Sequence, residues 1–457
     1  MGILFGTEGV RGRANEELTP ELAFKLGRAG AFCLAGRTGS RPRLVVGRDT
    51  RASGDMLEAA LVAGICSVGV DVLQVGVLPT PAIAHLTREL GAAGGVVVSA
   101  SHNPATDNGI KFFGPSGYKL SDAVEEQIEH LVLDSLAGVP SPSGVEVGRV
   151  YRVADAPDRY VAFVAQTARV DLRGRRIVVD CANGAAYQVA PRLLRELGAE
   201  VVAINHRPDG VNINVGCGST SPAALREEVR RLGADLGLAY DGDADRVVAV
   251  DEKGRLVDGD SIIYVCARHL KERGCLAGDA VVVTVMSNLG LREALAARGI
   301  RVIETRVGDR YVLEKLLETG ARLGGEQSGH VIFLDHSPTG DGLLTTVQLL
   351  SAVSSAGRTL AEMAGEWERY PQVLRSFGVE DKERVMRHPA LAAAVREQEG
   401  RLGGRGRVLV RPSGTEPVVR VMAEGPSEAV LEEVVAALGE VISRLDREGG
   451  VRGGGGE

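Results

Sequence analysis

Aromatic residues and paired cysteines are scarce in this chain, and each shortage excludes a class of protein. Only 4% of the 457 residues are Phe, Tyr or Trp, which disfavours recognition of nucleic-acid bases by stacking. The six cysteines show no Cys-x-x-Cys spacing. We therefore expect reduced thiols in a cytoplasmic chain, and neither a disulfide framework nor a structural zinc site.

Long apolar runs and an excess of basic charge are also missing. No uncharged stretch is long enough to span a membrane, and the first residues lack a signal-peptide pattern. The formal net charge is −7, which argues against nucleic acid or an anionic membrane as partner. A small anionic substrate would need local basic residues. No G-x-x-x-x-G-K-[ST] loop and no H-E-x-x-H motif occurs, which disfavours P-loop nucleotide hydrolysis and zinc proteolysis.

Short β-rich runs alternate with amphipathic segments over most of the chain, which favours parallel α/β layers. The cycle starts three times, at Arg43, Arg176 and Ala280, and this indicates three similar α/β units. Apolar residues make up 44% of the chain, enough for several cores. The expected strands are 43–47, 70–75, 176–180 and 280–284, and the expected helices are 55–67, 80–90, 185–197 and 291–297.

The pattern changes near 368–377 and then predicts a smaller α+β domain. This domain has a helix at 389–399, strands at 407–411 and 418–423, and a helix at 427–445. A segment rich in Pro, Ser and Gly at 137–148 suits an earlier boundary. We therefore divide the chain into domains at 1–150, 151–252, 253–367 and 368–448, followed by a disordered tail at 449–457.

A hydroxyl follows the apolar run 95–98 in the segment Ser99-Ala100-Ser101-His102-Asn103-Pro104. The pattern predicts a strand that ends in a turn, and parallel sheets bind ligands beyond the carboxyl ends of their strands. Ser101 is thus a candidate nucleophile or phosphate carrier, with a helix cap or plain turn as the alternative. His102 either orients the transferred group or shapes the turn, and we assign Asn103 to the turn.

Three carboxylates, those of Asp241, Asp243 and Asp245, follow another apolar run. Ionising all three has a high free-energy cost unless a cation lies among them. An EF-hand is excluded because Arg246 occupies the position where that loop needs Gly. Mg²⁺ with a phosphate oxygen fits best, and Arg246 would suit a transferring phosphoryl group. A solvated acidic turn is the alternative.

Two further segments carry polar groups suited to a sugar phosphate. Lys111 lies among apolar residues and is either an acid/base group or a surface lysine. The segment 324–330 places Glu326, Gln327 and Ser328 between glycines, where such groups can recognise sugar hydroxyls. A polar turn is the alternative for this second segment.

The segment 411–417 combines a guanidinium, two hydroxyls and a glycine, which is the composition of a phosphate cradle. Its candidate ligands are Arg411, Ser413, Gly414 and Thr415, with Arg420 projecting from the following strand. Near the N-terminus, a further arginine, Arg11, lies between glycines and either binds phosphate or belongs to an entry loop.

These motifs, in this order, resemble those of the α-D-phosphohexomutase superfamily. Segment 99–104 matches its phosphoserine loop, 241–246 its metal loop, 325–330 its sugar loop and 411–417 its phosphate loop. The resemblance extends from the first residues to about Glu440. It is strongest to bacterial members that act on glucosamine phosphate, as judged by segments 5–12, 212–220, 286–291 and 307–312 and by Gln327.

The resemblance implies a fold of three similar mixed α/β domains and a smaller C-terminal α+β domain around a central cleft. It implies that glucosamine 6-phosphate and glucosamine 1-phosphate are interconverted on the way to UDP-N-acetylglucosamine. Phosphoserine 101 would donate its phosphoryl group, and the bisphosphorylated sugar would turn around and return its other phosphate. A mutase for glucose and mannose phosphates, a non-catalytic phosphosugar-binding protein and a hydrolase are the alternatives.

The same resemblance implies roles for the individual residues. Lys111 and His330 become the acid/base candidates, and Arg11 and Arg246 lie near the transferring phosphate. One Mg²⁺ per active site is expected. The implied metal ligands are Ser101, Asp241, Asp243 and Asp245; the implied sugar ligands are Glu326 and Ser328; and the implied ligands of the second phosphate are Arg411, Ser413, Gly414 and Thr415. The expected partners are phosphosugars alone, for a monomer or homodimer.

Three positions depart from the family pattern. Glu8 replaces Asp, Ala244 replaces Gly in the metal loop, and Pro412 replaces Lys in the phosphate loop. Alanine would strain the metal loop if that position needs a positive φ. Proline removes one N–H and one positive charge from the phosphate loop.

Overall fold

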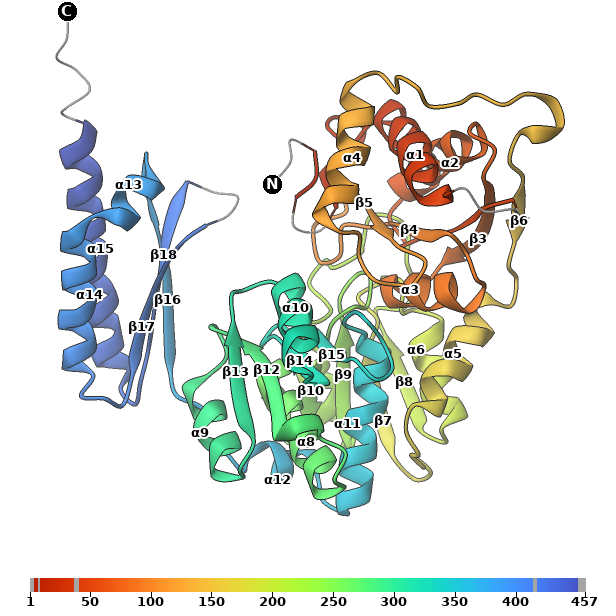
Figure 1. Ribbon diagram of the computed structural model, residues 1–457. Coiled ribbons are helices and arrows are strands. Elements are labelled where there is room, and N and C mark those ends of the chain that lie inside the picture. The colour runs from red at the N-terminus through yellow and green to blue at the C-terminus, as the bar shows by residue number, and fades with distance from the viewer. Residues whose placement is uncertain (1–3, 7–8, 37–40, 414–416, 451–457) are drawn as a thin grey trace, which may run out of the picture. The chain divides into compact units, whose positions relative to one another are not determined.

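The computed structural model describes residues 4–6, 9–36, 41–413 and 417–450 (Figure 1). The chain forms two compact units, one of residues 1–287 and 295–366, the other of residues 288–294 and 367–457. The short segment 288–294 was expected in the third domain. It groups with the second unit because Asn288 donates to the Tyr370 carbonyl (2.9 Å) and the Leu289 N–H donates to Glu424 (2.9 Å).

The first sheet has six strands in the order β1-β5-β4-β2-β3-β6. Helices α1, α2 and α4 cover one of its faces and α3 the other (Figure 1). The strands are β1 (Val10–Arg13), β2 (Arg43–Arg48), β3 (Asp71–Val77), β4 (Gly94–Val98), β5 (Asp107–Phe113) and β6 (Val150–Arg152). The helices are α1 (Pro20–Ala35), α2 (Ser53–Cys66), α3 (Thr80–Glu89) and α4 (Asp122–Leu133).

The second sheet has five strands in the order β11-β10-β9-β7-β8. Its strands are β7 (Arg176–Asp180), β8 (Glu200–Ile204), β9 (Leu236–Tyr240), β10 (Val247–Asp251) and β11 (Leu256–Val257), and its helices are α5 (Ala156–Gln166), α6 (Val189–Glu196) and α7 (Ala223–Leu232).

The third sheet has four strands in the order β13-β12-β14-β15. Its strands are β12 (Ala280–Thr284), β13 (Arg301–Thr305), β14 (Leu323–Gly325) and β15 (Val331–Phe333). The helices in this part of the chain are α8 (Gly259–Glu272), α9 (Leu289–Ala297), α10 (Asp309–Thr319), α11 (Gly342–Ala356) and α12 (Leu360–Ala364).

The three sheets share one topology, which confirms the three similar α/β units. In each, a central strand pairs in parallel with two neighbours, as β2 does with β3 and β4. The last of these parallel strands then pairs with an antiparallel strand that follows it in the chain: β4 with β5, β9 with β10, and β14 with β15. Segments 99–104, 241–246 and 325–330 occupy this same turn in the three repeats.

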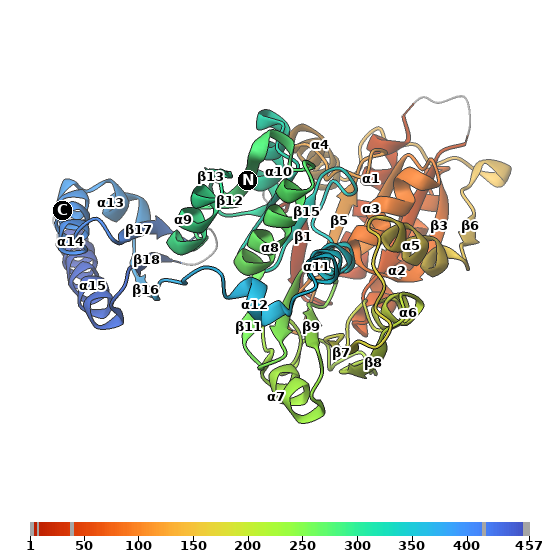
Figure 2. The same cartoon turned by 90° about the horizontal axis from the view of Figure 1, so that it is seen from below.

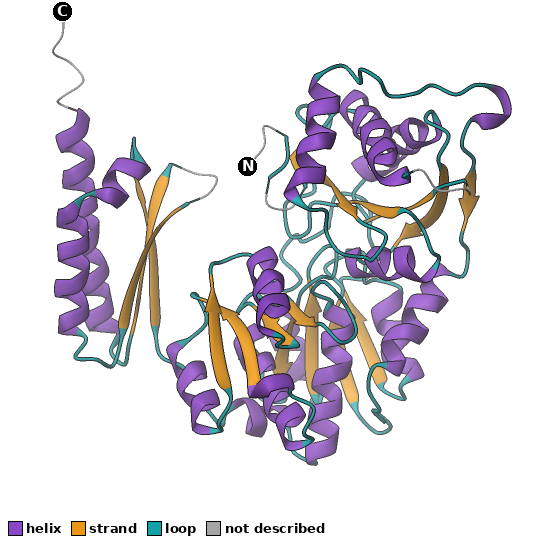
Figure 3. Cartoon of the chain, in the orientation of Figure 1, coloured by secondary structure: helices purple, strands orange, loops and turns teal. Residues whose placement is uncertain are grey.

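The strands of the first repeats are continuous apolar runs because helices cover both faces of their sheets (Figures 1 and 2). Val96, Val97 and Val98 of β4 are fully buried, as are Val178 and Val179 of β7. The polar residues therefore gather where these strands end. Figure 3 shows the loops that leave the strand ends of the first two sheets facing one another.

The second unit is a three-stranded antiparallel sheet with helices packed on it. Its order is β16-β18-β17, and α15 packs against β16 and β18 over a core that includes Val419, Val421 and Leu438. The strands are β16 (Gln372–Gly378), β17 (Arg407–Pro412) and β18 (Val418–Glu424), and the helices are α13 (Lys382–Arg387), α14 (Pro389–Arg401) and α15 (Glu428–Gly450). This confirms the smaller α+β domain.

Two expected segments differ from the structure by more than two residues at one end. Helix α6 begins at Val189, and not at 185, because the Ala185 N–H is bonded to the Gly242 carbonyl (2.8 Å) in a turn. Helix α15 continues to Gly450 and so includes the start of the expected tail, while residues 451–457 lie outside the described part. Within the described residues, no helix combines the length and apolar character needed to cross a membrane.

Helices α1 and α2 pack so closely that glycine is required at the contact. A Cβ at Gly64 would press into the carbonyl oxygen of Phe24, and one at Gly27 into that of Leu61.

We predict that Gly64→Ala lowers the free energy of unfolding by about 1–3 kcal/mol, because the helices must separate. Gly400→Ala in α14, where no atom lies within 4 Å of the added carbon, should change it by less than about 1 kcal/mol. Urea unfolding of both variants measures this, and equal losses would contradict the packing argument.

Candidate active site

Ser101 is buried at the turn after β4 and has a left-handed backbone, with φ +52°. Its hydroxyl donates to Oδ2 of Asp241 at 2.6 Å, although 140 residues separate the two in the chain. The ring nitrogen Nδ1 of His102 lies 3.4 Å from the same hydroxyl oxygen. Asn103 closes the turn through its N–H to the Ala100 carbonyl (3.1 Å), as expected. The structure thus brings the first two sequence motifs into direct contact.

Asp241, Asp243 and Asp245 form an acidic turn between β9 and β10, and this turn is followed by a strand and not by a calcium loop. One oxygen from each carboxylate lies within 4.8 Å of the others, and all three residues are buried. Oδ1 of Asp243 and Oδ1 of Asp245 have no hydrogen-bond donor among the described residues. Buried oxygens without donors, grouped at this spacing, are the ligand set that a hard divalent cation requires.

The electrostatics of the acidic turn lead to the same conclusion. Two like charges at this separation cost on the order of 3 kcal/mol at an effective dielectric of 20. Burial and the charges of Asp245 and Asp243 accordingly raise the pKa of Asp241 well above its usual range. A bound cation would remove this penalty and release the proton.

Asp243 is held ionised by two neighbours from the first α/β repeat, one on β5 and one at the start of α3. Burial and Asp245 oppose its charge, but the Lys111 ammonium (3.0 Å) and the Thr80 hydroxyl (2.6 Å) lower the pKa of Asp243. Lys111 is only 3% exposed, so the interpretation of a surface lysine is wrong. Its position two residues along β5 from Gly109 places it on the same side of the sheet as Arg11, which pairs with Gly109.

His330 and Arg246 lie at the third carboxylate. Nδ1 of His330 is 3.6 Å from Oδ2 of Asp245, and Nε of Arg246 is 3.7 Å from Oδ1 of Asp245. Burial opposes the ionisation of Asp245, but His330 and the other cations hold the pKa of Asp245 well below its usual value. Burial also opposes the charging of His330, whereas Asp245 and Asp309 raise its pKa. The N–H of Gly340 donates to Nε2 (3.1 Å), so the neutral ring faces Asp245 with its Nδ1 proton.

Glu326 and Ser328 lie in the turn between β14 and β15. Glu326 is half-buried, and burial raises its pKa, while its Oε1 accepts the N–H of Gly308 (3.1 Å). Ser328 is exposed and available to a ligand. The next residue after Gly308 is Asp309, whose pKa is lowered by Lys119 despite burial.

In the second unit, Arg411 and Arg420 lie opposite one another on β17 and β18. Burial and the facing Arg420 charge lower the pKa of Arg411, and a bound phosphate would relieve that repulsion. Ser413 comes directly after β17, and its carbonyl oxygen accepts a hydrogen bond from the Lys382 ammonium (2.7 Å). Pro412 is tolerated because β17 is an edge strand. Gly414 and Thr415 lie outside the described residues.

Ala244 confirms the strain anticipated from the sequence. Its φ is +57°, and it is fully buried within the acidic turn. A β-carbon in this region costs on the order of 1–2 kcal/mol. The turn is held in shape by the Ala244 N–H to the Asp241 carbonyl (3.1 Å) and the Arg246 N–H to Oδ1 of Asp241 (3.2 Å).

Several residues at the site were missed by sequence reasoning. Thr80 begins the helix after β3, and the rule that ligands gather at the carboxyl ends of strands would have found it. Arg51 and Asn214, which bind the main chain of the Ser101 turn, are the others. For Arg51, the available signal was that the sequence 47–51 places a charged pair directly after the apolar β2. Asn214 lies in segment 212–220, which carries the family resemblance, but nothing in the sequence indicates what its side chain binds.

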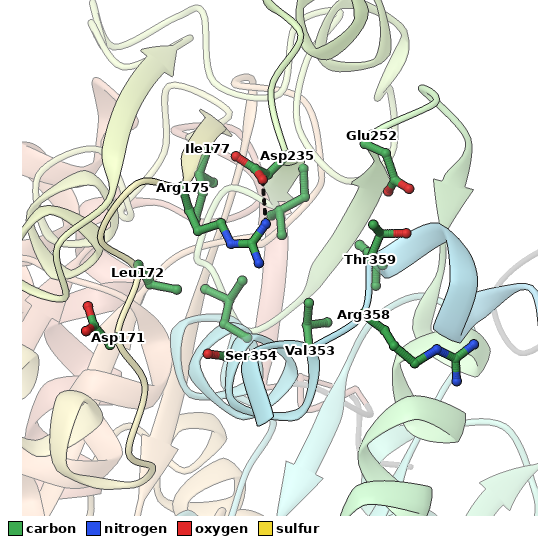
Figure 4. A pocket seen from close by; sticks show the side chains of 13 residues that line it. Asp171, Leu172, Arg175, Ile177, Asp235, Glu252, Val353, Ser354, Arg358 and Thr359 are labelled. Atoms are coloured by element: carbon green, nitrogen blue, oxygen red, sulfur yellow. Dashed lines mark hydrogen bonds and ion pairs between the residues drawn. The ribbon is translucent and has the colours of Figure 1, made fainter. Parts of the chain in front are cut away.

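A separate cavity of about 80 Å³ lies between the second sheet and α11 (Figure 4). Its two arginines already have acidic partners: Arg175 pairs with Asp235 (2.7 Å), and Arg358 pairs with Glu366. None of the residues predicted to act in catalysis lines this cavity. The three sequence motifs of the first unit lie elsewhere, in the turns at the ends of β4, β9 and β14.

Comparison with known proteins places the whole chain in one group. Models of the phosphoglucomutase/phosphomannomutase domains I, II and III and of its C-terminal domain match residues 2–136, 158–254, 258–370 and 377–441. The chain is 64% identical to a phosphoglucosamine mutase of Desulforamulus reducens, over 97% of this chain and all of the relative. It is 65% identical to the one of Pelotomaculum thermopropionicum, over 98% of this chain and all of that relative.

Solved structures show the same fold. A phosphoglucomutase/phosphomannomutase family protein from Burkholderia thailandensis superposes with a TM-score of 0.80 at 24% identity, covering 97% of both chains. The N-acetylphosphoglucosamine mutase of Aspergillus fumigatus, solved in complex with GlcNAc-6P and magnesium, gives 0.65 at 17% identity, covering 97% of this chain and 96% of that chain.

The strain at Ala244 leads to a stability prediction. We expect Ala244→Gly to raise the free energy of unfolding by about 1 kcal/mol, because glycine adopts a positive φ without penalty. Ala100→Gly is the control, since Ala100 is equally buried in a loop but has no positive φ. That control should lose stability. Denaturant unfolding compares the two, and destabilisation by Ala244→Gly would contradict the strain.

The raised pKa of Asp241 leads to a prediction for cation binding. Titration with Mg²⁺ should release protons, and the affinity should rise with pH, because the carboxyl must ionise to act as a ligand. Calorimetry in buffers of different ionisation enthalpy measures both. Asp245→Asn should lose binding, whereas the exposed Asp335→Asn should bind like the unmodified protein. Binding without proton release, or unaffected by Asp245→Asn, would contradict the assignment.

Proposed function

The chain belongs to the phosphoglucomutase/phosphomannomutase family, and from this we propose that it interconverts glucosamine 6-phosphate and glucosamine 1-phosphate. It is an intramolecular phosphotransferase of the isomerase class. The observation that carries the proposal is the 2.6 Å hydrogen bond between the buried Ser101 hydroxyl and Asp241 of the acidic turn. The product would feed the synthesis of UDP-N-acetylglucosamine. We further propose a cytoplasmic location and a monomer or homodimer.

Ser101 is the residue proposed to carry the phosphoryl group. A phosphoserine has a charge of roughly −1.5 to −2 and three strong acceptor oxygens, so it needs cations around it. Lys111 reaches the acidic turn at Asp243, and the Arg246 side chain lies beside Asp245. Arg11 lies on the same face of the sheet as Lys111. These three cations are proposed to balance charge as the group moves to the sugar.

The acidic turn is proposed to hold one Mg²⁺, with Asp241, Asp243, Asp245 and the phosphorylated Ser101 as ligands. The donorless oxygens of Asp243 and Asp245 fit this ion. When bound, Mg²⁺ would neutralise the carboxylates and draw charge from the transferring phosphoryl group. Thr80 and Lys111 orient the Asp243 carboxylate from the first α/β repeat, and His330 orients Asp245.

Proton transfer to and from the sugar hydroxyl needs a group beside the reacting oxygen. Lys111 and His330 are the proposed acid/base pair, and each contacts one carboxylate of the acidic turn. His102, 3.4 Å from the Ser101 hydroxyl oxygen, would orient the transferred group. No nucleotide is needed, because the sugar's other phosphate replaces the one that Ser101 gave in each cycle.

The substrate must be held by either end, since the bisphosphorylated sugar turns around between the two transfers. Glu326 and Ser328 are proposed to bind the sugar hydroxyls in both orientations. The phosphate that is not reacting is proposed to bind Arg411, Ser413, Gly414, Thr415 and Arg420. Two cross-strand arginines suit a phosphate dianion, which accepts paired N–H donors.

Steady-state kinetics with a trace of sugar bisphosphate tests the proposal. We predict that glucosamine 6-phosphate is the preferred substrate over glucose and mannose 6-phosphates, and that Ser101→Ala lowers kcat by at least about 10³-fold because the phosphoryl carrier is gone. Intact mass should show a phosphorylated fraction that Ser101→Ala removes. Ser143→Ala, an exposed serine without a capping bond, is the matched control and should keep full activity.

Three outcomes would each correct the proposal. A preference for glucose or mannose phosphate would overturn the substrate and favour the other branch of the family. Full activity of Ser101→Ala would overturn the carrier. Inorganic phosphate as the main product would replace the mutase by a hydrolase.

A further inference from the structure

We propose that Arg51 and Asn214 are positioning residues for phosphoryl transfer, because together they fix the main chain of Ser101 against the acidic turn. The inference rests on the proposed role of Ser101 as phosphoryl carrier. Among the described residues, the hydrogen bonds of Arg51 and Asn214 do not include the Ser101 hydroxyl, the carboxylates of the acidic turn or the sugar turn. They act instead on the carbonyl oxygen of Ser101, to which both donate.

Arg51 lies in the loop between β2 and α2 and is fully buried. Its guanidinium binds four main-chain carbonyls of the Ser101 turn. These are the carbonyls of Ser101 (2.8 Å), Asn103 (3.0 Å) and Asp107 (3.1 Å), together with that of Pro104. Only an arginine has enough donors in a planar fork to reach all of them. The side chain therefore replaces the hydrogen bonds that an irregular buried turn cannot make to itself.

The partner of Arg51 is Asp49, which is also fully buried. Oδ2 of Asp49 accepts from Nε of Arg51 (2.9 Å) and from the hydroxyl of Ser99 (2.6 Å). The Ser99 oxygen in turn accepts the N–H of Ser101 (3.0 Å). Both peptide groups that flank the Ser101 side chain are thus tied to a single buried ion pair, one through Ser99 and the other directly.

Asn214 reaches the same carbonyl from the second sheet's side. Its Nδ2 donates to the carbonyls of Ser101 (2.9 Å) and Asn103 (3.1 Å), and its own N–H is fixed to the Ala182 carbonyl (2.9 Å). A Cβ at Gly242, inside the acidic turn, would press into the Ser101 carbonyl and would lie 2.8 Å from Asn214 Nδ2. The loops that carry Arg51, Asn214 and Gly242 therefore meet at the Ser101 carbonyl oxygen. The loop of Gly242 is the acidic turn, which carries the carboxylates.

This convergence explains how a strained serine keeps its geometry. Ser101 has a positive φ, which a non-glycine residue retains only where its surroundings over-determine it. If either donor were lost, the peptide could relax, and its hydroxyl oxygen would leave the position 2.6 Å from Asp241. A displacement of about 1 Å at a reacting atom can cost on the order of a hundredfold in rate. Substrate binding by Glu326 and Ser328 would be untouched.

Two variants test the proposal in the full-length protein. Arg51→Lys keeps the charge that balances Asp49 but cannot hold all four carbonyls, and we expect kcat to fall by about a hundredfold. Asn214→Ala removes one donor and should lower kcat by about tenfold. In both, the KM for glucosamine 6-phosphate should change by less than about threefold. The rate at which sugar bisphosphate phosphorylates Ser101, followed by intact mass, should fall in parallel with kcat.

Asn212→Ala is the matched control. Asn212 lies in the same loop and makes similar bonds, to Arg207 (3.0 Å) and Asp209 (3.1 Å), but its side chain has no hydrogen bond to the Ser101 turn. It should keep kcat, while its loss of thermal stability should be smaller than that of Asn214→Ala, because Asn214 has a positive φ of +61°, which costs alanine more than asparagine. Asn214→Gln, whose longer amide cannot take the same position, should not restore the rate. If Arg51→Lys fails to fold, the comparison of Asn214→Ala with Asn212→Ala decides.

The outcomes separate this inference from the function on which it rests. If Asn214→Ala has the kcat of Asn212→Ala, or if KM and not kcat changes, the positioning role is overturned while the mutase stands. If the unmodified protein has no mutase activity, or if Ser101→Ala is fully active, the proposed function itself fails. A parallel loss of kcat and of phosphorylation rate at constant KM supports the inference.

Discussion

One hydrogen bond, from the Ser101 hydroxyl to Asp241, connects the proposed phosphoryl carrier with the acidic turn. Its donor lies at the end of β4 and its acceptor at the end of β9, in different sheets. The contact exists because the same topological turn, between the last parallel strand and its antiparallel neighbour, carries the functional residues in both repeats. The β14 to β15 turn carries Glu326 and His330 in the third. A single folding pattern, used three times, thus positions the residues proposed as phosphoryl carrier, metal ligands and sugar ligands.

The negative charge of the acidic turn determines which side chains can surround it. Three buried carboxylates would repel one another, and the structure opposes this with Lys111 and Thr80 from the first α/β repeat and His330 from the third. These neighbours do not neutralise all of the negative charge. The pKa of Asp241 stays raised, and among the described residues no donor reaches Oδ1 of Asp243 or Oδ1 of Asp245. The acidic turn therefore fits a cation and the phosphoryl group proposed for Ser101, and the backbone is strained at Ser101 and Ala244.

Much of this could be predicted from the sequence. The apolar runs around Val96, Val178 and Val282 predicted buried strands, and the resemblance of four ordered motifs predicted the family. The sequence pattern could not place Arg51 or Asn214, because their partners are main-chain carbonyls, which every residue has. It also could not show that Lys111 is buried, because only the pairing of β4 with β5 places Lys111 beside the acidic turn. The start of α6 was missed because the Ala185 N–H bonds to Gly242, a contact between distant segments.

The central claim is that Ser101 gives its phosphoryl group to one end of the sugar phosphate and takes the other phosphate of the resulting bisphosphate in return. The most direct measurement is a chase of protein carrying radiolabelled phosphate on Ser101 with unlabelled glucosamine 6-phosphate. The account predicts that the label leaves the protein at the turnover rate and appears first in sugar bisphosphate and then in glucosamine 1-phosphate. Label that stays on the protein during turnover, or that appears as inorganic phosphate, would contradict it.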